Sequence, residues 1–162
     1  MSLKRKMLPI GVENFEKLRR NDMYYVDKTE MISDLIMNHG DANLFTRPRR
    51  FGKTLTMDML KTFFEIGQDA SLFDGLTISS HSDICEKYQN KYPVVFISLK
   101  GATGSTYEKA NSMIKQLVAE EYQRHSYLAD SDILDSIEKD QFNRIRSISL
   151  NEGDLENSLR TL

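Results

Sequence analysis

The sequence has one cysteine, three prolines and no tryptophan among its 162 residues. With Cys85 alone, no intramolecular disulfide can form, which is typical of proteins in a reducing compartment. Eight glycines and three prolines are too few for a collagen-like or linker-like chain. No apolar run approaches the roughly 20 residues that a membrane helix requires, and no apolar segment follows the basic residues 4–6 as it would in a signal peptide. We therefore expect a globular, cytoplasmic protein with no membrane partner.

An excess of charge of one sign is also missing. The chain has 22 Lys and Arg residues against 24 Asp and Glu residues, so its formal net charge is −2. This balance removes the whole-chain argument for nucleic acid or an anionic membrane as the partner, although a local basic cluster could still act. The length lies within the usual range of one domain, and such a chain buries roughly two-thirds of the surface that it exposes when unfolded. A real hydrophobic core is therefore expected.

Two short apolar segments predict β-strands, and each is followed by a turn and then by a helical pattern. Residues 43–46 precede the basic turn 47–52, and residues 93–99 precede the glycine-containing turn 100–104. The helix after the first turn has an apolar stripe formed by Leu55, Met59, Leu60, Phe63 and Phe64. Two strand–turn–helix units in series favour an α/β fold, in which helices flank a parallel sheet with right-handed crossovers.

Helix starts are predicted from capping residues. Asp27, with Glu30 three residues later, resembles a capping box and predicts a helix over residues 28–39. Ser105 and Glu108 have the same spacing and predict a second capping box. The helix behind it is expected to bury Ile114, Leu117, Val118 and Tyr122.

The remaining patterns are weaker. Residues 72–76 predict a packed turn and residues 83–88 a short helix. The polar stretch after His125 is expected to be helical, with three apolar anchors, Ile133, Leu134 and Ile137. A last helix is expected near Asp154, but its apolar face of Leu155, Leu159 and Leu162 is cut off in mid-pattern. We therefore expect residues 1–162 to be the N-terminal part of one domain that is incomplete at its C-terminal end.

The turn between the first strand and its helix carries the strongest functional pattern. Gly52-Lys53-Thr54 supplies the last three residues of a P-loop, in which glycine lets the backbone approach phosphate, lysine bridges the β and γ oxygens and threonine coordinates magnesium. Arg47 replaces the first glycine, so the loop is a degenerate Walker A motif. A structural interpretation competes, in which the tripeptide is a chance sequence at a helix start and the neighbouring arginines are solvated.

Residues 47–55, Arg-Pro-Arg-Arg-Phe-Gly-Lys-Thr-Leu, and residues 25–29, Tyr-Val-Asp-Lys-Thr, resemble the bacterial AAA-ATPase-like family. The similarity continues through residues 63–64, 72–76 and 92–95, so it covers most of the chain. In that family the Pro-Arg-Arg-Phe-Gly-Lys-Ser/Thr loop is itself the usual form, so the missing glycine need not impair the loop. Members commonly join a P-loop NTPase-like domain to a C-terminal nuclease-like domain of the PD-(D/E)XK type.

The resemblance implies binding of ATP with magnesium, in which Thr54 coordinates the metal. The nucleotide-binding residues would be Arg49, Arg50, Phe51, Gly52, Lys53, Thr54 and Leu55. Hydrolysis needs a strand that ends in an acidic pair, and in the family this strand comes shortly after a helix similar to residues 154–162. We therefore expect these residues to bind a nucleoside triphosphate without hydrolysing it. Hydrolysis, and nucleic acid as a partner of the nuclease-like domain, would belong to a longer protein.

Two other functions stay open. Basic clusters at residues 4–6, 19–20 and 47–50 could converge into a face that binds nucleic acid, although acidic residues are dense from 130 to 140. Alternatively, the chain is a non-catalytic P-loop scaffold for partner proteins.

The motif at residues 25–29 also has two interpretations. Tyr24 or Tyr25 could stack on adenine, and Asp27 and Lys28 could lie near the nucleotide. Packing of the tyrosines, capping by Asp27 and an exposed charge on Lys28 explain the same residues more simply.

Overall fold

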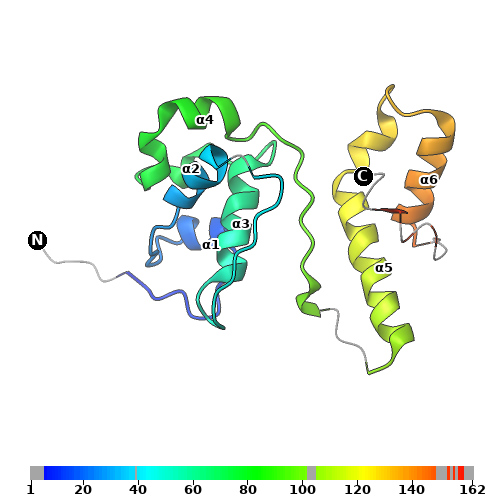
Figure 1. The fold of residues 1–162 in the computed structure, drawn as a ribbon, viewed down its shortest axis with the longest axis horizontal. Helices are drawn as coiled ribbons and strands as arrows, with labels where there is room; N and C mark the ends of the chain where they lie inside the picture. The colour runs from blue at the N-terminus through cyan, green and yellow to red at the C-terminus, as the bar shows by residue number, and fades with distance from the viewer. Residues whose placement is uncertain are drawn as a thin grey trace, which may run out of the picture. The chain divides into compact units, whose positions relative to one another are not determined.

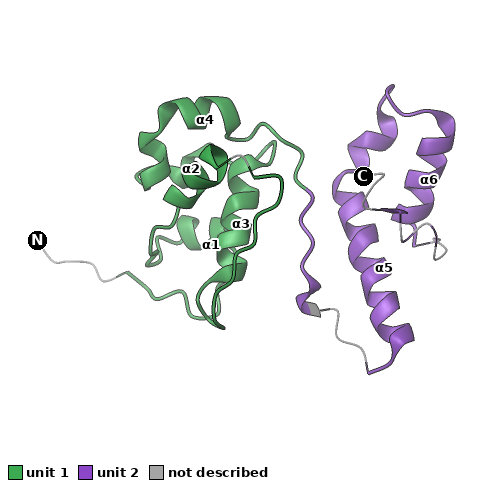
Figure 2. Cartoon of the chain, in the orientation of Figure 1, with its two compact units in different colours: residues 1–94 green, residues 95–162 purple. Residues whose placement is uncertain are grey.

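The structure is a computed structural model that describes residues 6–38, 40–101, 105–148, 153, 155, 157 and 158. Its α-helices are α1 (Phe15–Arg20), α2 (Glu30–Met37), α3 (Lys53–Phe64), α4 (Ser82–Tyr88), α5 (Tyr107–Arg124) and α6 (Ser136–Arg146) (Figure 1). Short 3-10 helices are η1 (Ala70–Phe73), η2 (Thr77–Ser80), η3 (Leu99–Gly101) and η4 (Ser126–Asp130). The chain divides into two compact units, residues 1–94 and residues 95–162 (Figure 2). None of the described helices combines the length and the apolar character that crossing a membrane requires.

The predicted parallel sheet is not found among the described residues, so the α/β prediction is wrong. The strand-like pairing recorded there is an isolated parallel bridge between Glu65 and Tyr92. Residues 43–46 and 93–98 have no regular structure. Leu44 is 88% exposed and Val95 is 48% exposed, whereas a central parallel strand buries such side chains on both faces. The two segments are apolar enough for strands, but neither forms a ladder with another described segment.

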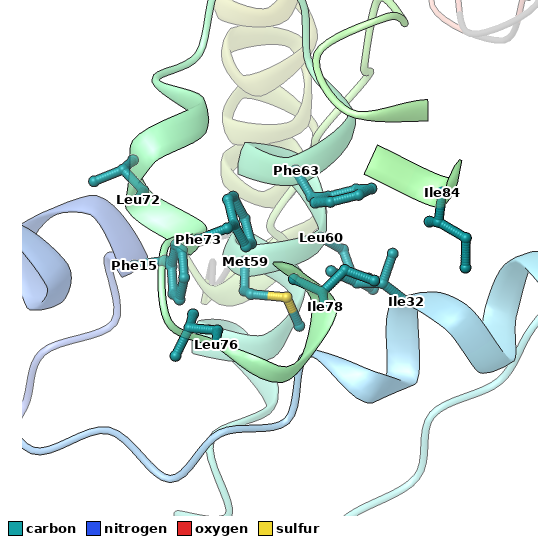
Figure 3. Packing of buried hydrophobic residues seen from close by; sticks show 10 residues of the cluster. All are labelled: Phe15, Ile32, Met59, Leu60, Phe63, Leu72, Phe73, Leu76, Ile78 and Ile84. Carbon is teal, nitrogen blue, oxygen red and sulfur yellow. The ribbon is translucent and has the colours of Figure 1, made fainter. Parts of the chain in front are cut away.

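The core of unit 1 is built around α3. Met59, Leu60 and Phe63 of this helix are buried, which confirms the apolar stripe predicted from the sequence. They pack with buried residues from the rest of the unit, namely Phe15, Ile32, Leu72, Phe73, Leu76, Ile78 and Ile84 (Figure 3). The rings of Phe63 and Phe73 meet edge to face with centroids 5.2 Å apart, an arrangement that adds to the gain from burial. The packed turn predicted over residues 72–76 is therefore confirmed.

Side-chain hydrogen bonds fix the helices of unit 1 to one another. The carboxylate of Asp58 in α3 accepts a 2.6 Å hydrogen bond from the backbone amide of Phe15, at the start of α1. The guanidinium of Arg19 in α1 donates to the carbonyl oxygens of Leu72 and Asp74, each at 2.7 Å. These contacts hold α1 against α3 and against the turn that contains η1.

The helices predicted over residues 28–39 and 83–88 are present as α2 and α4, but the expected capping box of α2 is wrong. Thr29 is the N-cap of α2 and makes no side-chain capping hydrogen bond. The Asp27 carboxylate accepts hydrogen bonds from both Thr29 and Thr77 instead. Glu30 lies 3.2 Å from Nε2 of His81 rather than reaching back to the cap. Contacts with residues about fifty positions away have replaced the local capping geometry.

In unit 2, α5 and α6 pack together around Val118, Tyr122, Phe142 and Ile145. The predicted cap of α5 is wrong by one residue, because Thr106 rather than Ser105 is the N-cap and accepts from the amide of Lys109. Val118 and Tyr122 are buried as predicted, whereas Ile114 is exposed.

The anchors expected after His125 are also mostly wrong, since Ile133 is 91% exposed and Ile137 is 74% exposed. Asp135 and Glu138 form a capping box at the start of α6, and this start sets the register that turns Phe142 and Ile145 inward. The helix predicted near Asp154 lies mostly outside the described residues, with Leu159 and Leu162.

Candidate phosphate-binding loop

Residues 47–52 form an exposed loop that turns into α3. Arg50 has φ 68° and Gly52 has φ 75° and ψ 23°, so both lie in the left-handed region that glycine adopts without strain. Gly52 is the N-cap of α3, and its carbonyl accepts the 2.8 Å hydrogen bond from the amide of Thr56. Because Gly52 has no side chain, it does not compete for the first amide groups of the helix. An anion can therefore approach these amides closely.

Lys53 lies over this loop. Its Nζ atom donates to the carbonyl oxygens of Arg47 at 2.5 Å and of Pro48 at 3.2 Å. Two backbone carbonyls therefore hold the ammonium group at the turn, although the side chain is exposed. A phosphate oxygen bound in the turn would replace these carbonyls as its partner.

Lys28 brings a second ammonium group to the loop from before α2. Its Nζ atom donates to the carbonyl of Phe51 at 3.1 Å and lies 3.6 Å from the position that a Cβ atom on Gly52 would occupy. From the sequence, a position of Lys28 near the nucleotide is one of two interpretations, and an exposed charge is the other. The structure places Lys28 at the loop.

A cavity of about 470 Å³ opens beside the loop, and we call it the charged cavity. Three cationic side chains line it, those of Lys28, Arg47 and Lys53. Glu30 and Asp34 from one face of α2 also line it, together with the rings of Phe45 and Phe51. From the sequence, Glu30 is expected only as part of a cap, and no role is expected for Asp34. Their i, i+4 spacing was the available signal that both point to the same side of a helix.

A second cavity of about 280 Å³, which we call the aromatic cavity, is lined mainly by apolar and aromatic side chains. These include Pro9, Leu18, Tyr24, Tyr25 and Leu55, with Arg50 and Gly52 of the loop. Lys28, Phe51 and Thr56 line both cavities, so the two share part of their walls. The structure thus brings the motif at residues 25–29 and the loop at residues 47–55 together around two adjoining cavities.

Tyr25 and Asp27 have clear packing roles. Tyr25 meets Phe15 edge to face at 5.4 Å. Burial, with a smaller effect from the charge of Asp27, raises the pKa of Tyr25 to about 12, so its hydroxyl stays neutral at ordinary pH. Burial opposes the charged form of Asp27, but hydrogen bonds from Thr29 and Thr77 outweigh it and hold the pKa of this carboxyl below its usual value. Asp27 is therefore ionised, and its carboxylate links the start of α2 to η2 through hydrogen bonds.

Two of the predicted site residues do not line these two cavities. Arg49 is exposed on the loop, and Thr54 is half-buried in the first turn of α3. Leu55 lines the aromatic cavity rather than the charged one.

The basic clusters at residues 4–6 and 19–20 are locally paired where they are described. Lys6 forms an ion pair with Asp22 at 2.5 Å. Arg20 pairs with Glu16 at 2.7 Å and with Asp69 at 3.0 Å. In these pairs, carboxylates of unit 1 balance the positive charges of Lys6 and Arg20. The pairs therefore do not favour a continuous basic face for nucleic acid.

Comparison with known proteins agrees with the resemblance in sequence. An uncharacterized protein in the vnfD 5′ region of Azotobacter chroococcum mcd 1 is 40% identical over 100 residues, which are 61% of this chain and 18% of that protein. The match thus spans less than a fifth of the relative's length. No solved structure matches the chain significantly. The family described as Predicted AAA-ATPase matches residues 9–157. Since this match covers most of the sequence, the chain belongs to the Predicted AAA-ATPase family.

Proposed function

We propose that the chain binds a nucleoside triphosphate, ATP or a close relative, with magnesium at residues 49–55. The observation that carries this proposal is the convergence of Lys28, Arg47 and Lys53 on the charged cavity beside the N-terminus of α3. A helix N-terminus favours a bound anion, and lysine and arginine side chains neutralise phosphate charge. The volume of about 470 Å³ lies within the range of small-molecule sites.

Five residues of the loop and of the first turn of α3 have a role in this proposal. Gly52 lets the backbone approach phosphate, and Lys53 exchanges the carbonyls of Arg47 and Pro48 for oxygens of the β- and γ-phosphates. Arg49 and Arg50 add positive charge at the exposed rim. Magnesium keeps oxygen ligands in an octahedral arrangement, so the Thr54 hydroxyl would hold it together with phosphate oxygens rather than alone.

This proposal does not depend on the parallel sheet. The loop takes its shape from Arg50 and Gly52, and the following helix supplies the amides. Membership of the Predicted AAA-ATPase family is consistent with nucleotide binding in general. Hydrolysis, nucleic acid as a partner and a cytoplasmic location stay predictions.

Isothermal calorimetry with ATP and magnesium tests the proposal. Wild-type protein should bind, and Lys53→Ala should weaken binding by about 10- to 150-fold, the loss of a hydrogen bond to a charged group. Lys61→Ala is the matched control, because Lys61 is in the last turn of the same helix and pairs with Glu65. Absence of binding to the wild-type protein contradicts the proposal. Equal losses in Lys53→Ala and Lys61→Ala would mean that net charge, rather than the loop, holds the nucleotide.

A further inference from the structure

The aromatic cavity is not needed for the phosphates, yet it adjoins the charged cavity. Lys28, Phe51 and Thr56 line both, and Gly52 of the phosphate loop lines the aromatic one. Lys28, Phe51 and Thr56 are thus common walls of the two cavities, and a ligand whose phosphates lie at Lys53 has the aromatic cavity next to it. We propose that this cavity takes the nucleobase of the bound nucleotide, with Tyr24 as the side chain on which the base stacks. This inference rests on the proposed nucleotide binding.

The size and lining of the aromatic cavity fit a base. Its volume of about 280 Å³ lies just below the range of complete small-molecule sites, as expected for a subsite that holds one ring system. Its apolar lining includes Pro9, Leu18 and Leu55, and the two tyrosine rings. Every nucleobase has a π face that stacks on an aromatic side chain, whatever its hydrogen-bonding edge.

The two tyrosines have different surroundings, and this difference assigns their roles. Tyr25 packs against the core of unit 1 and meets Phe15 edge to face, so it forms a fixed wall of the cavity. Tyr24 is 52% exposed although it lines the same cavity. Its backbone amide donates to the carbonyl of Met7 at 2.8 Å, which fixes the chain at this position. Tyr24 therefore offers exposed ring surface that a base would cover.

The experiment compares two probes that differ by the nucleoside. ATP and inorganic tripolyphosphate are titrated by calorimetry, with magnesium, into the wild-type protein and its variants. Tyr24→Ala should weaken ATP binding by roughly 5- to 150-fold, the effect of removing an aromatic stacking partner, and leave tripolyphosphate affinity within about twofold. Tyr24→Phe keeps the ring and should bind ATP within about threefold of the wild type. Lys53→Ala should weaken both probes.

Tyr107→Ala is the matched control, since Tyr107 is 72% exposed and is not among the residues that line the two cavities. It should change neither affinity. The inference is overturned if Lys53→Ala weakens both probes while Tyr24→Ala leaves ATP affinity unchanged. It is also overturned if Tyr24→Ala weakens tripolyphosphate as much as ATP, because the role of Tyr24 would then be structural. Failure of ATP and tripolyphosphate to bind the wild-type protein would instead reject the nucleotide site itself.

Discussion

The two units of the chain use polar groups differently. Unit 1 has an apolar core that includes three phenylalanines, Phe15, Phe63 and Phe73, and its cationic side chains at the loop are exposed. The described core of unit 2 is smaller and lies next to a buried carboxylate, that of Glu121. Charge in unit 2 is thus part of the interior, whereas charge at the loop of unit 1 is available to a ligand.

Glu121 shows what a buried charge does in unit 2. It is 4% exposed and accepts hydrogen bonds from the amide of Phe96 at 2.6 Å and from Nη1 of Arg124 at 2.6 and 2.7 Å. Nε2 of the buried His125 lies 3.5 Å away, and Nδ1 of this histidine is 3.0 Å from the hydroxyl of Tyr127. The carboxylate therefore joins the segment before η3 to α5, and its role is structural.

The largest effect is expected from breaking the apolar core of unit 1. Phe63 is fully buried and packs on Phe64 and Phe73. Phe63→Ala should lower the free energy of unfolding by about 3–5 kcal/mol, because it removes apolar contacts and leaves a cavity. Urea denaturation measures this loss, and hydrogen exchange of the α3 amides locates it. Phe51→Ala, at a ring that is 59% exposed, should change stability by less than about 0.5 kcal/mol. Similar losses in both variants would show that α3 does not form the core described.

A smaller loss is expected when the buried charge of unit 2 is neutralised. Glu121→Gln keeps the shape of the side chain but leaves Arg124 without its full counter-charge. We expect a loss of about 1.5–3 kcal/mol in the free energy of unfolding, the range for hydrogen bonds to charged groups. Glu120→Gln changes the exposed neighbour on the same helix and should cost less than about 0.5 kcal/mol. If the two variants lose the same amount in urea denaturation, the contrast between the units is wrong.

Local patterns predicted α2, α3, α4 and α5, but they predicted neither α1 nor the absence of the sheet from the described residues. The stripe on α3 and the turn at residues 72–76 depend on neighbours in the sequence, and both are confirmed. A strand depends on a distant segment for its hydrogen bonds. The apolar runs at 43–46 and 93–99 have the length of strands, but a local sequence pattern does not show whether a partner segment pairs with them. The capping box at Asp27 failed for a similar reason, because Thr77 and His81, about fifty residues away, contact Asp27 and Glu30.

The candidate site was predicted where it is contiguous in sequence. Gly52 and Lys53 follow from the motif, and the structure places both at one turn. The contact of Lys28 with the carbonyl of Phe51 and the position of Asp34 in the charged cavity depend on how α2 and the residues before it pack against the loop. No spacing rule within a single helix or loop contains that information.

The smallest loss in the free energy of unfolding is expected at Asp27 of unit 1, whose carboxylate accepts hydrogen bonds from Thr29 and Thr77. Asp27→Asn replaces one accepting oxygen by a donor, and because the site is partly exposed we expect a loss of about 1 kcal/mol at pH 7.

The pH dependence of this loss follows from the lowered pKa of Asp27 in the folded chain. A lowered pKa means that the stabilisation is present above the unfolded value of about 3.9 and disappears as the pH falls through the lower folded value. The difference in unfolding free energy between wild type and Asp27→Asn should therefore be constant near neutrality and shrink below about pH 4. Asp74→Asn, at an exposed carboxylate, should lose less than about 0.5 kcal/mol at pH 7. If the difference in unfolding free energy between wild type and Asp27→Asn persists unchanged to pH 2, the new amide disturbs the packing of η2. The charge of Asp27 would then contribute nothing to the link between α2 and η2.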